Sequence, residues 1–330
     1  MARKVILDVD TGGDDAIAIM TAALCPDLEV VGICTTWGNL PIENTTENTL
    51  RVVQLLGMDI PVARGASQAM VKTLFPGRLH NPYTPDFVMD ENGNRIGYHD
   101  PYLPIPAATI KESDLCAVEF YIKALTESAE KITLIPVGPL TNLALAMRAK
   151  PSICEKIEQI VIMGGGHTQR NDTASAEFNI WCDPEAAQVV LTSGCDITIV
   201  PLDATHRTAL TMDHARRFTE MRTPVGDLTA KLIEERITAY QLLQPANSTG
   251  ELSTPIHDAL AVCAVIDPSV LTEVLYTRVN VDMSGGYADG ATIVDTREKQ
   301  DQPKNCHFAL DADIDKFADM LVNYLGRFGG

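Results

Sequence analysis

The chain has 330 residues, 45% of them hydrophobic, and its formal net charge at pH 7 is −18. A chain of this length buries a large core, while its acidity argues against nucleic acid or an anionic membrane as the main partner. Its eight cysteines are scattered without a CxxC pair, the N-terminal apolar run is too short for a signal peptide, and no run approaches the length of a membrane span. We therefore expect a cytoplasmic protein with reduced cysteines.

Short β-branched runs alternate with longer amphipathic runs along the whole chain. The pattern predicts strands at residues 3–9, 29–36, 60–63, 132–137, 158–163, 196–201 and 274–282. It predicts helices at residues 14–24, 42–57, 113–129, 139–149, 184–193, 224–244, 256–266 and 313–327. Such alternation indicates an α/β fold, with a mainly parallel central sheet and helices on both faces. We expect one domain over residues 1–330.

Two stretches interrupt the alternation of strands and helices. Residues 70–110 are rich in Pro, Gly, Asn and Asp, and residues 203–255 contain polar, helix-poor segments at 203–224 and 245–255. Loops this long in a compact domain are usually functional, so both stretches are predicted to be active-site loops. A disordered insertion is the alternative for residues 70–110.

Four aspartates lie within eight residues directly after the first predicted strand: Asp8, Asp10, Asp14 and Asp15. Like charges this close repel one another, and burying them adds a desolvation cost that a bound cation relieves. They follow a strand and begin a helix, and open α/β sheets bind ligands at the carboxyl ends of their strands. The cluster therefore predicts a metal site, with a solvated acidic turn as the alternative.

Further polar motifs follow the other predicted strands. They are TTWGN at residues 35–39, VGPLTN at 137–142, MGGG at 163–166 with AEFN at 176–179, and His257-Asp258 at a helix start. Each motif alone is compatible with an ordinary turn or helix cap. In a parallel sheet their positions converge, and together they predict an oxygen-rich cavity with one imidazole.

The segment DVDTGGDDA resembles the DxDxGxDDA signature of the nucleoside hydrolases, the inosine-uridine-preferring nucleoside N-ribohydrolases. The resemblance continues in order through TTWGN, VGPLTNLA, IVIMGGG, AEFNIWCDPEAA and PIHDALAV, and it ends with Asp282, Gly290, Asp295 and Asn305. It covers nearly the whole chain. It implies a nucleoside hydrolase-like open α/β fold and hydrolysis of the N-glycosidic bond of ribonucleosides to nucleobase and ribose, in purine and pyrimidine salvage.

The resemblance also implies a calcium site and a reaction. In this family Ca²⁺ is held by carboxylates that match Asp10, Asp15 and Asp258 and by a backbone carbonyl that matches Val137, an all-oxygen set that suits this ion. Asp10 is then the general base that activates a water, and an oxocarbenium-like charge develops on the ribose. His257 is the implied proton donor to the leaving base, with a pKa suited to acid catalysis near neutrality. Asp8 is interpreted as support for its neighbours.

The ribose site implied by the same resemblance consists of polar groups and one methionine. These residues are Asp14, Asn39, Met163, Asn171, Glu177 and Asn179. Amide and carboxylate groups supply the fixed donors and acceptors that recognise a sugar with three hydroxyls. For Met163, plain core packing is the alternative.

The base side of the site departs from the family pattern. The usual HGxxGLG stretch is replaced by a longer, different sequence, which offers His80 and His99 as candidates without a clear match. On the predicted helix 224–244, Arg236 and Tyr240 share a face at i and i+4. The sequence does not select purine or pyrimidine bases. Family members are commonly homodimers or homotetramers, and we expect one of these states here.

Two other functions compete with nucleoside hydrolysis. Asp8-Val9-Asp10-Thr11 matches the DxDxT motif of haloacid-dehalogenase-type phosphohydrolases, in which the first Asp is the nucleophile and Mg²⁺ is bound. That interpretation leaves TTWGN, AEFN and HDA without roles. A non-enzymatic ribose-binding module would need neither a general base nor an acid, and the presence of Asp10 and His257 favours an enzyme.

Overall fold

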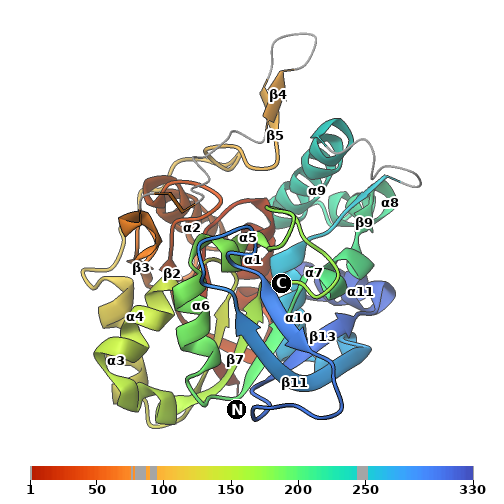
Figure 1. Ribbon diagram of the computed structural model, residues 1–330. Helices are drawn as coiled ribbons and strands as arrows, with labels where there is room; N and C mark the ends of the chain where they lie inside the picture. The colour runs from red at the N-terminus through yellow and green to blue at the C-terminus, as the bar shows by residue number, and fades with distance from the viewer. Residues whose placement is uncertain (1, 76, 79–86, 90–94, 244–251, 330) are drawn as a thin grey trace.

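The structure is a computed structural model, and it describes residues 2–75, 77–78, 87–89, 95–243 and 252–329. Its centre is a nine-stranded sheet (Figure 1). The strands lie in the order β12-β11-β13-β8-β7-β6-β1-β2-β3. In chain order their bounds are β1 (Arg3–Val9), β2 (Leu28–Thr35), β3 (Val62–Arg64), β6 (Ile132–Pro136), β7 (Ile157–Met163), β8 (Ile197–Val200), β11 (Glu273–Val281), β12 (Thr292–Asp295) and β13 (Cys306–Asp311).

The sheet is mainly parallel, as the sequence predicts. In the order across the sheet, each strand from β3 to β13 pairs in parallel with its neighbour. Strands β11 and β12, at the opposite edge from β3, add the antiparallel pairs of this sheet. From β1 the chain proceeds outward to β2 and β3 on one side, and it later proceeds outward on the other side from β6. The strand order therefore reverses between β1 and β6, and their carboxyl ends form the crevice where α/β sheets bind ligands.

Helices cover both faces of the sheet (Figure 1). Alternate residues of β1 explain the two layers, because Val5, Leu7 and Val9 enter one apolar core and Ile6 enters the other. The first core includes α1 (Gly13–Leu24), α2 (Ile42–Leu56), α9 (Pro224–Leu243), α10 (His257–Ile266) and α11 (Ile314–Leu325). The second includes α3 (Ala117–Glu127), α4 (Thr141–Ala149) and α6 (Pro184–Leu191).

Every predicted strand and helix is present, with ends shifted by a few residues. The expectation that residues 203–224 are helix-poor is wrong, because they include most of α7 (Leu202–Thr205) and all of α8 (Met212–Thr219). Helix α8 buries only Ala215 and Phe218, so its apolar pattern is too sparse to stand out in the sequence. Its stability comes from a Thr211 N-cap and from packing against α9.

The remaining short elements lie mostly in the two interrupting stretches. The hairpin of β4 (Phe87–Met89) and β5 (Arg95–Gly97) extends away from the body of the molecule (Figure 1). Strands β9 (Leu210–Thr211) and β10 (Ser253–Thr254) pair with each other, and α5 (Phe178–Cys182) is a single short helix. Strands β12 and β13 are also absent from the sequence prediction.

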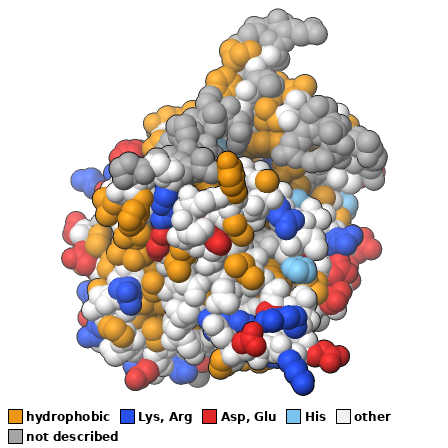
Figure 2. Space-filling model, in the orientation of Figure 1, with side chains coloured by type: hydrophobic (Ala, Val, Ile, Leu, Met, Phe, Trp, Pro, Cys, Tyr) orange, Lys and Arg blue, Asp and Glu red, His pale blue; other side chains and the backbone are white. Residues whose placement is uncertain are grey.

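None of the described helices is both long and apolar enough to cross a membrane. On the face drawn in Figure 2, basic and acidic side chains are interspersed around the surface.

Candidate active site

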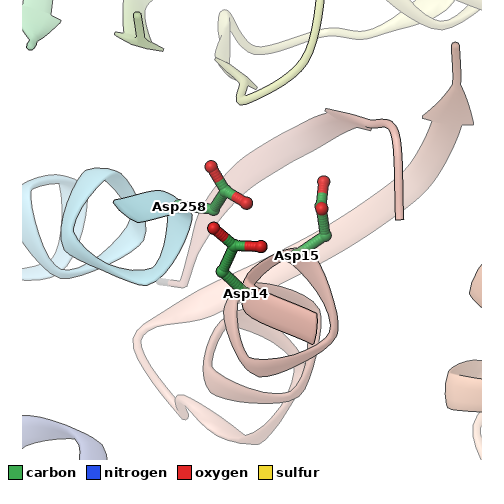
Figure 3. A group of neighbouring side chains, drawn as sticks. All are labelled: Asp14, Asp15 and Asp258. Carbon is green, nitrogen blue, oxygen red and sulfur yellow. The ribbon is translucent and has the colours of Figure 1, made fainter. Parts of the chain in front are cut away.

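Three carboxylates converge at the crevice between β1 and β6. Asp14 and Asp15 belong to the first turn of α1, and Asp258 belongs to the first turn of α10. Figure 3 shows them pointing toward one another, and each offers an oxygen within 4.8 Å of the others. All three are buried. The sequence brings them together because both helices begin directly beside the strand ends, where a helix N-terminus favours negative charge.

The three carboxylates differ in their electrostatic surroundings. Burial and then Asp14 raise the pKa of Asp15 to about 7, and burial followed by Asp14 and Asp15 raises the pKa of Asp258 well above its usual range. Asp14 differs: burial raises its pKa, but Arg236 and His99 outweigh this and lower it. Buried carboxylates are all-oxygen ligands, and the raised pKa values of Asp15 and Asp258 show that their charges are not balanced by the protein, so the group fits a hard cation such as Ca²⁺.

Asp10 lies beside this group, and its carboxylate is held on several sides. The backbone N–H of Asn39 donates to Asp10 Oδ2 at 2.6 Å. A Cβ atom at Gly38 would lie 2.1 Å from Oδ2, and one at Gly138 would lie 2.7 Å from Oδ1, so both positions require glycine. Burial and then Asp15 raise the pKa of Asp10 well above its usual range.

The cluster of three differs from the predicted ligand set in one carboxylate. Asp14, which is expected to bind ribose, belongs to this cluster, and Asp10 does not. The reason is local: Asn39 holds the Asp10 carboxylate, whereas Asp14 follows Gly13 into the first turn of α1 beside Asp15. Asp15 also accepts hydrogen bonds from the backbone N–H groups of Asp10 (3.0 Å) and Gly12 (2.9 Å).

Asp8 lies on the other face of β1, away from the cluster. Its carboxylate accepts hydrogen bonds from Tyr121 Oη at 3.1 Å and from Asn142 Nδ2 at 2.9 Å. Burial raises its pKa to about 7. Asn142 also donates to the Thr35 carbonyl, so Asp8 joins the ends of β1, β2 and α4. A buried carboxylate with these partners is not placed to act as the nucleophile of a phosphohydrolase.

Helix α5 brings Asn179 to the end of β6. Asn179 Nδ2 donates to the Val137 carbonyl at 2.7 Å and to the Met163 carbonyl at 3.1 Å. The Val137 carbonyl has a second lone pair for a cation, as its predicted role requires. Glu177 caps α5: its carboxylate accepts hydrogen bonds from the backbone N–H groups of Gly165, Asn179 and Ile180. Burial raises the pKa of Glu177 to about 7 despite these donors.

The other predicted ribose residues lie at different depths. Asn39 is half-buried, and its side chain donates to Asp15 Oδ2 at 3.3 Å. Asn171 is exposed, and its Oδ1 accepts a hydrogen bond from the Phe178 N–H, so it orders the loop before α5. His80 lies outside the described residues.

His257 begins α10 and is buried beside the carboxylates. Its Nδ1 lies 2.7 Å from Thr205 Oγ1 in a hydrogen bond. Burial, then Arg236 and then His206, lower the pKa of His257 well below its usual value. Burial and the neighbouring Arg236 cation thus both disfavour the charged form of the imidazole.

The base-side candidates cluster over the start of α1. Arg236 pairs with both oxygens of Asp14, at 3.1 Å and 3.0 Å, and its guanidinium lies 6.0 Å from the Tyr240 ring. The His99 ring lies against Gly12, where an added Cβ would come within 2.1 Å of Nδ1. Tyr98 meets the edge of Tyr240 with ring centroids 5.0 Å apart. Tyr98 and His99, from the stretch 70–110, thus lie beside Tyr240 of α9 and the start of α1.

Sequence reasoning missed several partners of the site residues. Thr205 lies in a stretch interpreted as a polar loop, and Tyr121 lies in the middle of a helix, so neither position carried a signal. Asn142 was part of the VGPLTN motif, and its role as a donor to Asp8 was accessible only through the strand order. The ion pair between Asp14 and Arg236 joins residues 222 positions apart.

Comparison with known families completes this description. The model of the family described as inosine-uridine preferring nucleoside hydrolase matches residues 5–319. The chain belongs to this family. The predicted resemblance is therefore confirmed over nearly the whole chain, and this nucleoside hydrolase is an enzyme that cleaves N-glycosidic bonds.

The relatives of this nucleoside hydrolase include proteins of different base preference. Pyrimidine-specific ribonucleoside hydrolase RihA of Photobacterium profundum is 34% identical over 330 residues, 99% of this chain and 100% of the relative. RihA of Escherichia coli is 35% identical over 326 residues, 98% of this chain and 99% of the relative. The structure of a purine-preferring ribonucleoside hydrolase from Gardnerella vaginalis has a TM-score of 0.85 at 31% identity and covers 98% of both chains. The predicted α/β fold is confirmed.

Proposed function

We propose that this protein hydrolyses ribonucleosides to nucleobase and ribose in a calcium-dependent reaction that serves purine and pyrimidine salvage. The observation that carries the proposal is the buried group of Asp14, Asp15 and Asp258 at the strand-order reversal, with Asp10 beside it. The Val137 carbonyl completes an oxygen-rich set of cation ligands with Asp10, Asp15 and Asp258. Bound Ca²⁺ would lower the pKa of a water and orient the ribose hydroxyls.

In this proposal, Asp10 removes a proton from the attacking water. The backbone N–H of Asn39 donates to Asp10 Oδ2 at 2.6 Å and fixes the orientation of this carboxylate. As the bond from C1′ to the base lengthens, positive charge develops on the ribose. We propose that the carboxylates act as acceptors near this charge and stabilise it. Glu177 and Met163 shape the floor beneath the sugar.

His257 assists departure of the nucleobase. Thr205 can donate its hydroxyl proton to Nδ1, which leaves the proton of the neutral ring on Nε2. A neutral imidazole donates a hydrogen bond to a leaving group that is accumulating negative charge. Arg236 and Tyr240 lie on the same side and provide a cation and an aromatic ring for the base.

The direct test is a panel of inosine, adenosine, guanosine, uridine and cytidine, assayed for reducing sugar with and without added Ca²⁺. We expect ribose release from at least one nucleoside, and little release after chelation. Because relatives of similar identity are named for opposite base preferences, the panel also assigns this preference. Purified, folded protein that releases no ribose from any of the five with Ca²⁺ present contradicts the proposal.

Replacing His257 with Ala is expected to lower kcat/KM for a natural nucleoside by about 100-fold, the contribution of a positioned proton donor. The loss should be much smaller with p-nitrophenyl riboside, because p-nitrophenolate departs without a proton. Thr205→Val, which removes the partner of Nδ1, should show the same pattern to a smaller extent. Steady-state kinetics with both substrates measure this, and equal losses would exclude the proton-donor role.

We also propose that the enzyme is a cytoplasmic homodimer or homotetramer, as members of this family commonly are. All eight cysteines are free in the structure, which supports a reducing compartment. Light scattering coupled to size-exclusion chromatography measures the oligomeric state.

A further inference from the structure

A cluster of buried charges lies against the C-terminal end of α5. Lys72 Nζ is 3.6 Å from Asp289 Oδ2, and Arg78 Nη2 donates to Asp289 Oδ1 at 2.7 Å. Arg78 also pairs with Glu185 at the start of α6. Lys72 is 3% exposed and Asp289 is 2% exposed. The cluster therefore joins three parts of the chain that are far apart in the sequence: Lys72 and Arg78, α6, and the loop before β12.

Lys72 contacts α5 directly at its C-terminal end. Its ammonium donates a hydrogen bond to the Trp181 carbonyl at 2.5 Å and lies 3.4 Å from the centre of the Trp181 ring. Gly290 packs against the same residue, since an added Cβ there would lie 2.5 Å from Trp181 Cα. One end of this short helix is thus held between a lysine and a glycine.

The same helix carries two of the proposed ribose-site residues on its other side. Asn179 bridges the Val137 and Met163 carbonyls, and Glu177 caps the helix start. A five-residue helix has too few hydrogen bonds of its own to define its position. A second anchor lies next to it, where the backbone N–H of Met70 donates to Asp183 Oδ2 at 2.8 Å.

We propose that Lys72, oriented by Asp289 and Arg78, is a positioning residue that fixes Asn179 against the end of β6. Buried ion pairs seldom add stability beyond that of apolar residues of the same volume, so a geometric role accounts for this one better than stability. The inference rests on the proposed function, because the position of Asn179 affects catalysis only if ribose binds beside it.

The test compares Lys72→Met, Lys72→Arg and the double variant Lys72→Met/Asp289→Asn, which removes both charges together. Lys4→Met is the matched control, because Lys4 pairs with Glu130 at the surface near the N-terminal end of β1. We expect Lys72→Met to lose about 100-fold in kcat/KM, the effect of a displacement of about 1 Å. Lys72→Arg should regain most of this loss. Lys4→Met should match the wild type.

The double variant separates positioning from stability. It removes one buried cation and one buried anion together and leaves Arg78 paired with Glu185, so its Tm should be at or above that of Lys72→Met, while kcat/KM stays low. Recovery of both quantities overturns the inference, as does wild-type kcat/KM in folded Lys72→Met. If Lys72→Met does not fold, kcat/KM is compared between the double variant and the wild type alone.

Hydrogen exchange of the α5 backbone amides provides a readout that does not depend on activity. Both Lys72→Met and the double variant should exchange these amides faster than the wild type, with unchanged exchange in α3. Wild-type protein without nucleosidase activity would reject the proposed function, and the exchange result would then decide the positioning role by itself. Unchanged protection of α5 in the folded variants overturns that role.

Discussion

Replacing Asp10 with Asn is expected to lower kcat by about 10²- to 10⁴-fold, the contribution of a general base. The amide keeps an oxygen for the Asn39 N–H and fits between Gly38 and Gly138, so the geometry is preserved while the proton acceptor is lost. Because the variant also removes one buried negative charge, its Tm without added cation should equal or exceed that of the wild type. Ribose release and a thermal melt measure the two quantities.

The matched control for this experiment is Asp196→Asn. Asp196 immediately precedes β8, at the opposite end of the sheet from the cluster, and its side chain is 56% exposed. This variant should retain wild-type kcat. Normal turnover by Asp10→Asn would exclude Asp10 as the base, and a loss of folding in that variant alone would assign Asp10 a structural role instead.

Chelation of divalent cations is expected to lower the Tm strongly at pH 8 and weakly at pH 5. In the cation-free protein, burial holds the pKa of Asp15 at about 7 in the folded state, above its ordinary value of 3.8. Between these two values the folded state keeps a proton that the unfolded state has released. Stability therefore falls as pH rises through this window, by up to about 1.4 kcal/mol per pH unit for each such group, and levels off above it.

A bound cation reverses this dependence because it favours the ionised carboxylates. At pH 8 the cation stabilises the folded protein by mass action, whereas at pH 5 protons compete with it for Asp15 and Asp258. Thermal melts at both pH values, with chelator and after readdition of Ca²⁺ or Mg²⁺, measure the effect. Equal falls in Tm at the two pH values would contradict a site made of these carboxylates.

The sequence predicted the sheet and its covering helices well because the spacing of apolar residues along the chain reflects which side chains are buried. The run Lys4–Val9 alternates between two apolar cores, and its position between β6 and β2 follows from the parallel crossovers. Strand β13 was missed since its pairing with β8 joins segments far apart in the chain. Helix α8 was missed because packing on α9, a tertiary effect, stabilises a sequence with little local pattern.

Within the site, the order of the motifs predicted which segments of the chain lie together. It did not predict which atoms of those segments contact one another. Asp10, Asp14 and Asp15 share one short segment, and only the hydrogen bond from Asn39 to Asp10 and the first turn of α1 determine which carboxylate faces Asp258. The depressed pKa of His257 was equally inaccessible, since it depends on burial and on Arg236 from α9. Such properties arise from three-dimensional neighbours, which spacing along the chain does not encode.

The two glycines that flank Asp10 limit how this enzyme can be altered. Neither Gly38 nor Gly138 has a functional group, yet any side chain at either position would collide with the Asp10 carboxylate. A saturation-mutagenesis scan for turnover should find both positions as intolerant as Asp10 itself. Libraries intended to change nucleoside preference should therefore leave them constant and diversify Tyr98 and Tyr240, whose rings contact each other beside Arg236.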